Sequence, residues 1–259
     1  ITMHPELEAL INVCAEASVT HVVLAGGVPS SGSIVKLKKT GIKIICFAPA
    51  LALAKRMIKN GADALIIEGT EAGGHIGPVA TSVLAQEILP HITDIPVFVA
   101  GGISRGEAIV SYLEMGASGC QLGTRFVCAN ESIAHPNFKE SFIRANSRDA
   151  VPTVQIDPKF PIIPVRALVN EGTKLFSQAQ REAAVRVEKG EVELKEAQLE
   201  IEHFWAGALK RAVIDGDVEY GSLMAGQSVG MVKTEQPTQE IIDELIHQAI
   251  NCLSNRGKS

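Results

Sequence analysis

The chain has 259 residues, and its 46% apolar and 20% charged residues are typical of a globular protein with a sizeable core. Lys and Arg number 24 against 29 Asp and Glu, so the formal net charge is −5, and aromatic residues make up only 4%. A basic surface and base stacking are therefore both disfavoured, which argues against nucleic-acid binding. The longest apolar run, residues 44–54, is well short of the ~18 residues of a membrane span.

The five cysteines are an odd number, and no two of them form a CxxC pair. This pattern argues against a zinc site and against a disulfide framework, and it is typical of reduced thiols. No signal peptide is recognisable, and the opening ITMHPELEAL has the pattern of the middle of an amphipathic helix. The sequence therefore predicts a cytoplasmic protein.

A short apolar run followed by a helical pattern recurs through the first half of the chain. The predicted strands cover residues 19–26, 42–48, 62–69, 95–102 and 119–126. Almost all of their residues are apolar, as in strands that are covered on both faces. Helices are predicted between them, over 52–60, 82–91 and 105–115. Alternating strands and helices of this kind predict parallel strands with right-handed crossovers.

The pattern changes after residue 150. Residues 151–165 hold four prolines and are not expected to be helical. Beyond them we expect helices over 167–188, 191–213 and 239–253, with a glycine-rich loop over 215–230. No obvious linker separates the two halves, so we treat residues 151–259 as a helical region that closes onto a partial barrel formed by residues 1–150.

The motif EGTEAGGHIG covers residues 68–77 and directly follows a predicted buried strand. In parallel α/β folds, ligands bind at the carboxyl ends of the strands, so we expect the ends of all five predicted strands to meet at one cleft, with His75 pointing into it. Gly73 and Gly74 allow the backbone to approach a flat ligand without a Cβ clash. His75 follows them, and an imidazole can act as acid or base near neutral pH. A tight turn with an incidental histidine is the alternative, but the double glycine and two nearby carboxylates favour a functional histidine.

Two further glycine-containing segments lie one βα unit apart. Gly101 and Gly102 end one predicted strand, and Gly123 and Thr124 end the next. Their backbone N–H groups, with a helix N-terminus, can hold a dianion, and the loops after the last two strands of a (β/α)8 barrel form its usual phosphate site. The pair of segments therefore favours a phosphate-tailed cofactor such as FMN.

The segment MAGQ begins at Met224 and lies in the second glycine-rich loop. It could pack against a cofactor ring. A simple loop with a helix cap explains the same residues equally well, so both interpretations stay open.

Taken together, EGTEAGGHIGP, VFVAGGIS, QLGTRFV and SLMAGQSVG resemble the nitronate monooxygenase family, also called 2-nitropropane dioxygenase. They also resemble the FMN-dependent enoyl-acyl-carrier-protein reductase II of bacteria. The segments ALAKRM, ESIAHPNFKE and GALKRAVIDGDVEYGSLMAGQ are more similar to the reductase branch. The resemblance covers nearly the whole chain.

This resemblance implies an α/β (β/α)8 TIM barrel with a C-terminal helical elaboration that covers the substrate. It implies FMN as cofactor, NADH or NADPH as reductant, and His75 as the catalytic histidine. The residues implied in cofactor binding are Ala72, Gly73, Gly74, Gly101, Gly102, Gly123, Thr124 and Met224. No metal is implied.

Three functions remain open. The first is reduction of the double bond of an enoyl thioester, free or on acyl-carrier protein. The second is oxidation of alkyl nitronates with O2, with His75 as the base. The third is a non-catalytic fragment. A homodimer is a further open alternative.

This chain also differs from what the resemblance implies for the family. Family members carry ~60–80 further N-terminal residues, which supply the first three barrel strands. Only five of the eight strands are recognisable here, so we expect two open edges, at residues 22–24 and 122–123. We also expect weak flavin affinity and association through those edges.

Overall fold

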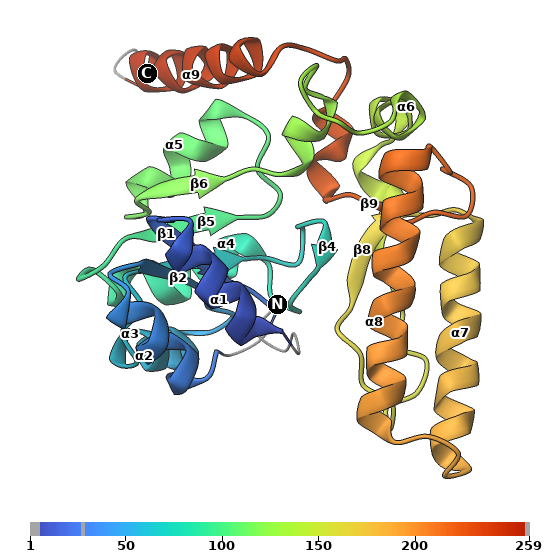
Figure 1. Cartoon of the computed structure of the whole chain (residues 1–259). Coiled ribbons are helices and arrows are strands. Elements are labelled where there is room, and N and C mark those ends of the chain that lie inside the picture. Colours follow the sequence, from blue (N-terminus) through green and yellow to red (C-terminus); the bar gives the residue numbers. More distant parts are fainter. Residues whose placement is uncertain (1–5, 27–28, 257–259) are drawn as a thin grey trace.

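In the computed structural model, which describes residues 6–26 and 29–256, the chain forms two sheets with helices packed around them (Figure 1). The larger sheet has five strands in the order β1-β2-β3-β5-β6, and every neighbouring pair is parallel. These strands are β1 (His21–Leu24), β2 (Lys43–Phe47), β3 (Ala64–Glu68), β5 (Val97–Ala100) and β6 (Gly119–Gln121). The five predicted strands and their parallel arrangement are confirmed.

Helices alternate with these strands along the chain. They are α1 (Leu7–Glu16), α2 (Ser31–Lys39), α3 (Leu51–Lys59), α4 (Thr81–Ile88) with the 3-10 turn η1 (Leu89–His91), and α5 (Gly106–Glu114). Gly61 and Gly116 follow α3 and α5 with φ of 106° and 102°, a conformation that favours glycine. The predicted strand over 119–126 is too long, because the chain turns at Gly123 and enters a 3-10 helix, η2 (Thr124–Cys128).

The two faces of the edge strand β1 differ in burial. Leu24, Ile44 and Leu65 belong to the main buried cluster, together with residues of the surrounding helices. Side chains alternate along a strand, so Val23 lies on the other face, and 48% of it is exposed. Since β1 and β6 end the strand order, the sheet is the open part of a barrel, as expected.

This openness predicts unequal effects of two neighbouring truncations. Leu24→Ala should lower the free energy of unfolding by roughly 2–5 kcal/mol, because it empties a buried position. Val23→Ala should change it by about 0.5 kcal/mol or less, because the side chain already faces solvent. Urea denaturation of both variants measures the difference, and equal losses would mean that both faces of β1 are covered.

A second, antiparallel sheet joins the barrel part to the rest of the chain. It consists of β4 (Gly74–His75), β8 (Val165–Leu168) and β7 (Ala150–Pro152), with β9 (Leu223–Met224) paired to β8. The predicted helix over 167–188 is therefore wrong at its start. Ala167 and Leu168 pair with β7 and β9, and the helix begins after Asn170, whose side chain accepts a hydrogen bond from the Thr173 N–H at 3.1 Å.

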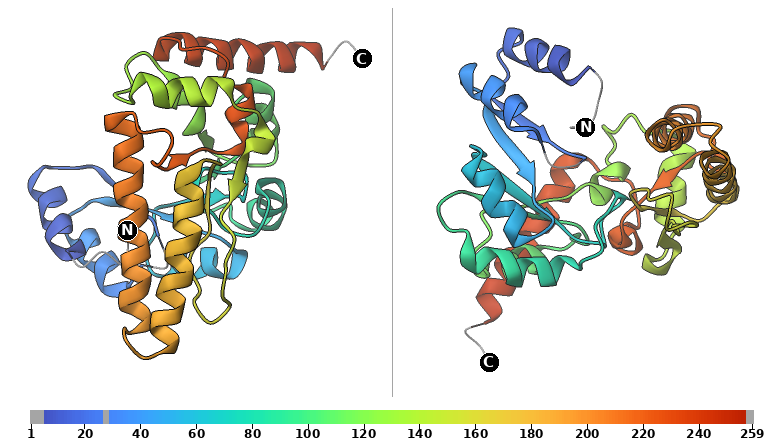
Figure 2. Two further views of the ribbon diagram at one scale, coloured as in Figure 1. Left: turned by 90° about the vertical axis from the view of Figure 1, so that its right-hand side faces the viewer. Right: turned by 90° about the horizontal axis from the view of Figure 1, so that it is seen from below.

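The remaining helices form two groups. One is the hairpin of α7 (Glu171–Glu188) and α8 (Leu194–Lys210), which stands beside the larger sheet (Figure 2); α8 runs into a π-helical turn, η4 (Arg211–Asp215). The other comprises α6 (Pro136–Arg144), η3 (Ser147–Asp149), η5 (Gln227–Met231) and α9 (Thr238–Asn255).

Helix α9 packs back against α5, where the Gly106 N–H donates to Gln248 Oε1 at 2.8 Å. Helix α9 thus lies against the barrel part. The predicted division at residue 150 stays a prediction. Within the described residues, no helix has the length and hydrophobicity needed to cross a membrane.

Candidate active site

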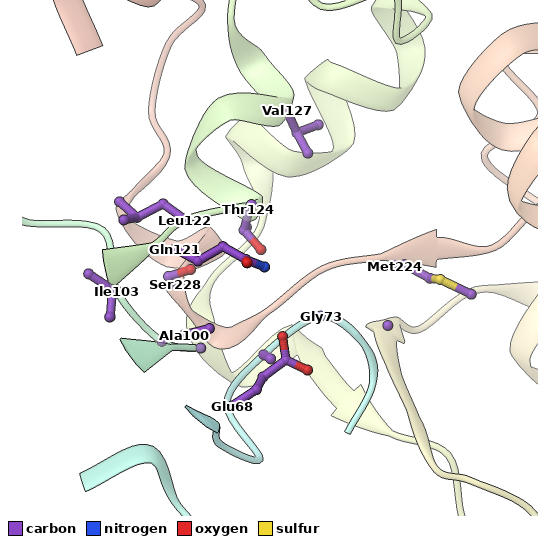
Figure 3. Close-up of a pocket in the computed structure, with 15 residues that line it drawn as sticks. Glu68, Gly73, Ala100, Ile103, Gln121, Leu122, Thr124, Val127, Met224 and Ser228 are labelled. Atoms are coloured by element: carbon purple, nitrogen blue, oxygen red, sulfur yellow. The ribbon is translucent and has the colours of Figure 1, made fainter. Parts of the chain in front are cut away.

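A cavity of about 330 Å³ lies at the carboxyl ends of β3, β5 and β6 (Figure 3). All eight residues predicted to bind a cofactor line it: Ala72, Gly73, Gly74, Gly101, Gly102, Gly123, Thr124 and Met224. No described residue of β1 or β2 lines it, so the expectation that all five strand ends meet at one cleft holds for three of them. The physical reason is that β1 and β2 lie toward one edge of the sheet, away from β5 and β6.

Three loops interlock around this cavity. The Gly226 N–H donates to Thr124 Oγ1 at 3.0 Å, and the Gln227 N–H donates to the Glu71 carbonyl at 2.9 Å. A Cβ on Gly73 would lie 2.5 Å from the Gly226 nitrogen, closer than Cβ atoms come to other atoms. The glycine at position 73 is therefore required by contact between two loops. Sequence reasoning assigned it only to the approach of a ligand.

The cavity wall carries backbone amides without protein partners. Among the described residues, the N–H groups of Gly101, Gly102 and Gly123 donate to no protein acceptor. Gly101 and Gly102 both have positive φ, 92° and 73°, and no atom lies within 4 Å of where a Cβ on Gly123 would be. Half-buried free amides of this kind suit an anionic group such as a phosphate. These residues therefore fit the phosphate of a flavin nucleotide.

The two carboxylates of the EGTEAGGH motif have different roles. Glu71 accepts hydrogen bonds from the Thr81 N–H at 2.8 Å and the Thr81 hydroxyl at 2.9 Å, so it anchors the start of α4. Glu68 lines the cavity and accepts no hydrogen bond within the part of the chain that the structure describes. Burial raises the pKa of Glu68 to about 7, while the neighbouring His75 opposes this rise. Glu68 thus carries an exchangeable proton near neutral pH.

Sequence reasoning missed three polar residues of the cavity lining, Glu68, Gln121 and Ser228, while it included Thr124. Figure 3 shows Glu68, Gln121 and Thr124 directing their polar ends into the space between the loops, with Met224 on its far side. The buried Ser228 also lines the cavity. The only available signal for Glu68 and Gln121 was their position at the last residue of a strand, where side chains face the ligand edge.

The pKa of Glu68 predicts how stability depends on pH. Between pH 4.5 and about 7 the unfolded chain has lost the Glu68 proton while the folded protein keeps it, so this residue makes stability fall as pH rises. The Glu68→Gln variant has no carboxyl group at this position, so it does not lose stability in this way as the pH rises. Its free energy of unfolding should therefore exceed that of the native protein by an amount that grows with pH and reaches up to about 3 kcal/mol at pH 8.

Urea denaturation at several pH values checks this prediction. Glu188→Gln, at an exposed position on α7, is the matched control and should show no such trend. A Glu68→Gln difference that stays constant between pH 5 and pH 8 would mean that Glu68 ionises normally in the fold.

His75 lies at the edge of the cavity rather than in its lining. Its backbone pairs with Val165 of β8, and its Nε2 lies 3.0 Å and 3.3 Å from the two carboxylate oxygens of Glu202 on α8. The expectation that His75 points into the cleft is therefore not met for the Nε2 side of the ring, which faces Glu202 on α8. Sequence reasoning could not find Glu202, which lies 127 residues away in an ordinary helical charge pattern.

Comparisons with a family model and with a solved structure both match nearly the whole chain. A family model described as nitronate monooxygenase matches residues 6–248. The structure of FabK from Thermotoga maritima superposes with a TM-score of 0.83 at 34% identity, covering 99% of this chain and 76% of that one. This similarity confirms the α/β-barrel fold class.

Two curated relatives have more specific names. A (3aS,4S,5R,7aS)-5-hydroxy-7a-methyl-1-oxo-octahydro-1H-indene-4-carboxyl-CoA dehydrogenase from Rhodococcus jostii is 28% identical over 88% of this chain and 70% of its own length. A probable nitronate monooxygenase from Staphylococcus aureus is 28% identical over 96% of this chain and 68% of its own length.

Proposed function

This chain belongs to the nitronate monooxygenase family of flavin oxidoreductases, and we propose that it uses FMN and NADH or NADPH to reduce the double bond of an enoyl thioester. One observation carries the proposal. The cavity that presents the free amides of Gly101, Gly102 and Gly123 lies beside His75 and is lined by Glu68, whose pKa burial raises to about 7.

The protein's own contribution is binding and orientation. The three free amides, with Thr124 at the start of η2, would hold the cofactor phosphate. Ala72, Gly73 and Gly74 would lie along the ring system, and Met224 would cover it from β9. When bound, the flavin supplies hydride transfer.

His75 would complete the reduction by supplying a proton. Reduction of an enoyl thioester adds a hydride to the β-carbon and a proton to the α-carbon, and NAD(P)H is oxidised to NAD(P)+. His75 would donate the proton to the α-carbon, because its imidazole lies at the cavity edge and its Nδ1 has no protein partner among the described residues. Glu68, when protonated, would be a second proton donor at the same cavity.

Two observations support a thioester as substrate. The sequence motifs resemble the enoyl reductase branch, and FabK, an enoyl-acyl-carrier-protein reductase II, is structurally similar. The relative from Rhodococcus jostii is named for a CoA thioester.

Nitronate oxidation is the second candidate, favoured by the name of the Staphylococcus aureus relative. In that reaction the substrate needs a base rather than an acid, and His75 would take a proton. The two candidates differ in their need for NAD(P)H, which only the reductase uses.

The test measures products from the FMN-supplemented protein. With a short-chain enoyl-CoA and NADH under anaerobic conditions, mass spectrometry should detect the saturated thioester. Consumption of an alkyl nitronate with O2 and no NADH, without any saturated thioester, would overturn the reductase in favour of the second candidate. Absence of both products and of bound flavin absorbance would support a non-catalytic fragment.

A further inference from the structure

Glu202 reaches His75 from a helix that lies outside the barrel sheet. Its Oε2 lies 3.0 Å from His75 Nε2, and both side chains are about one-third exposed, at 34% and 36%. Within the described residues, no other group bonds to the imidazole ring, so its Nδ1 has no protein partner. The carboxylate therefore determines which ring nitrogen is available for chemistry.

Both partners of this contact sit on well-packed elements. The α8 residues Ile201 and Trp205 are buried, and the Trp205 ring lies 4.1 Å from that of Phe176 on α7. This packing fixes the rotation of α8 and hence the position of Glu202. On the other side, pairing of His75 with Val165 fixes the backbone that carries the imidazole. The pair is therefore defined by the fold and not by two mobile surface side chains.

The chemistry of the two groups limits where the protons can be. An ionised carboxylate can only accept hydrogen bonds, so Nε2 must carry a hydrogen when it bonds to Glu202. A neutral His75 then holds its lone pair on Nδ1, and a charged one carries its second proton there. We propose that Glu202 is a positioning residue that holds His75 in the Nε2–H tautomer, so that Nδ1 is the nitrogen that exchanges a proton with the substrate.

The substrate named in this inference rests on the proposed function, whereas the His75 tautomer rests only on the contact with Glu202. In the reductase, Nδ1–H would give its proton to the α-carbon, and the neutral ring would keep its Nε2–H bond to Glu202. Solvent would then return the proton to Nδ1. For a nitronate, the same Nδ1 lone pair would accept the proton. In both cases Glu202 touches neither substrate nor cofactor and acts through His75.

Nitrogen-15 NMR of histidine-labelled protein tests the tautomer without turnover. The His75 signals are identified by their loss in His75→Ala, and the spectra are recorded where the ring is neutral. We expect the Nε2–H tautomer in the native protein. Glu202→Gln should populate the other tautomer as well, because an amide can either accept or donate.

Glu200→Gln is the matched control. Glu200 lies on the same helix, two residues from Glu202, and pairs with Arg186 of α7 at 2.7 Å. This variant should retain the native His75 spectrum. An Nδ1–H tautomer in the native protein, or an unchanged His75 spectrum in Glu202→Gln, would overturn the proposal.

Kinetics separate this inference from the proposed function. Glu202→Gln should lower kcat roughly 10- to 100-fold with little change in KM. It should have no further effect in the His75→Ala background, because its role acts through that ring. Full activity of Glu202→Gln beside a slow His75→Ala would overturn the positioning role. If neither substrate is turned over while the tautomers behave as expected, the proposed function fails and the assignment of Glu202 stands.

Discussion

Replacing His75 with alanine is expected to lower turnover by roughly 10²- to 10⁴-fold, the usual contribution of a positioned general acid or base. Flavin binding should be largely retained, because His75 lies at the edge of the cavity and outside the loops whose free amides face it. The measurement is steady-state turnover of the flavin-loaded variant, with flavin content determined from visible absorbance.

The chain offers a matched control for this substitution. His203 is exposed on α8, next to Glu202, and His203→Ala should retain native turnover. If flavin-loaded His75→Ala is as fast as the native protein, His75 has no part in the mechanism. If it loses its flavin, His75 is a cofactor ligand instead.

The second large effect is expected at Gly69, directly after β3. A Cβ at this position would lie 2.0 Å from Thr81 Oγ1 and 2.2 Å from the Thr81 nitrogen. The Thr81 backbone cannot move aside as the end of a flexible side chain can, and hydrogen bonds to Glu71 hold it in place. Gly69→Ala should therefore lower the free energy of unfolding by roughly 3 kcal/mol or more, and it should weaken flavin binding by displacing the cavity loops.

Gly77→Ala is the control within the same motif, because nothing lies within 4 Å of its added Cβ. Its urea denaturation midpoint should stay close to that of the native protein. Equal midpoints for Gly69→Ala and Gly77→Ala would contradict the close packing of the β3 loop against α4.

The parallel sheet could be predicted because its signal is local. Four of its strands, β1, β2, β3 and β5, contain Val or Ile pairs within a mostly apolar run, which is recognisable without its partners. The second sheet has no such signal. β4 and β9 have two residues each, and β8 includes the buried Arg166, whose guanidinium donates to the Thr70 carbonyl at 2.9 Å. These strands exist through contacts between distant segments, so no periodicity identifies them.

The candidate site was predictable where glycines mark the loops, and not where distant residues decide its chemistry. All eight cofactor-binding candidates line one cavity, and their roles there stay predictions. Which carboxylate of the motif faces the cavity depends on Thr81, which donates two hydrogen bonds to Glu71, whereas no described residue donates one to the Glu68 carboxylate. The partner of His75 comes from α8, and only the folded chain brings it within reach.

The open sheet bears on the expected strength of flavin binding. Val23 on the edge strand β1 is 48% exposed and lacks the cover that further strands would provide. We therefore expect weak flavin affinity and association through the edges of β1 and β6. Weak binding does not remove the phosphate contacts, because the amides that face the cavity lie on the loops after β5 and β6.

The most direct test of the candidate site compares FMN with riboflavin, which lacks the phosphate. Titration of the protein with each compound, followed by flavin fluorescence, yields two dissociation constants. Since hydrogen bonds from several free amides to a charged group each contribute about 1.5–3 kcal/mol, FMN should bind roughly 10²-fold or more tightly than riboflavin. Equal affinities, or no binding of either compound, would contradict a phosphate site formed by Gly101, Gly102 and Gly123.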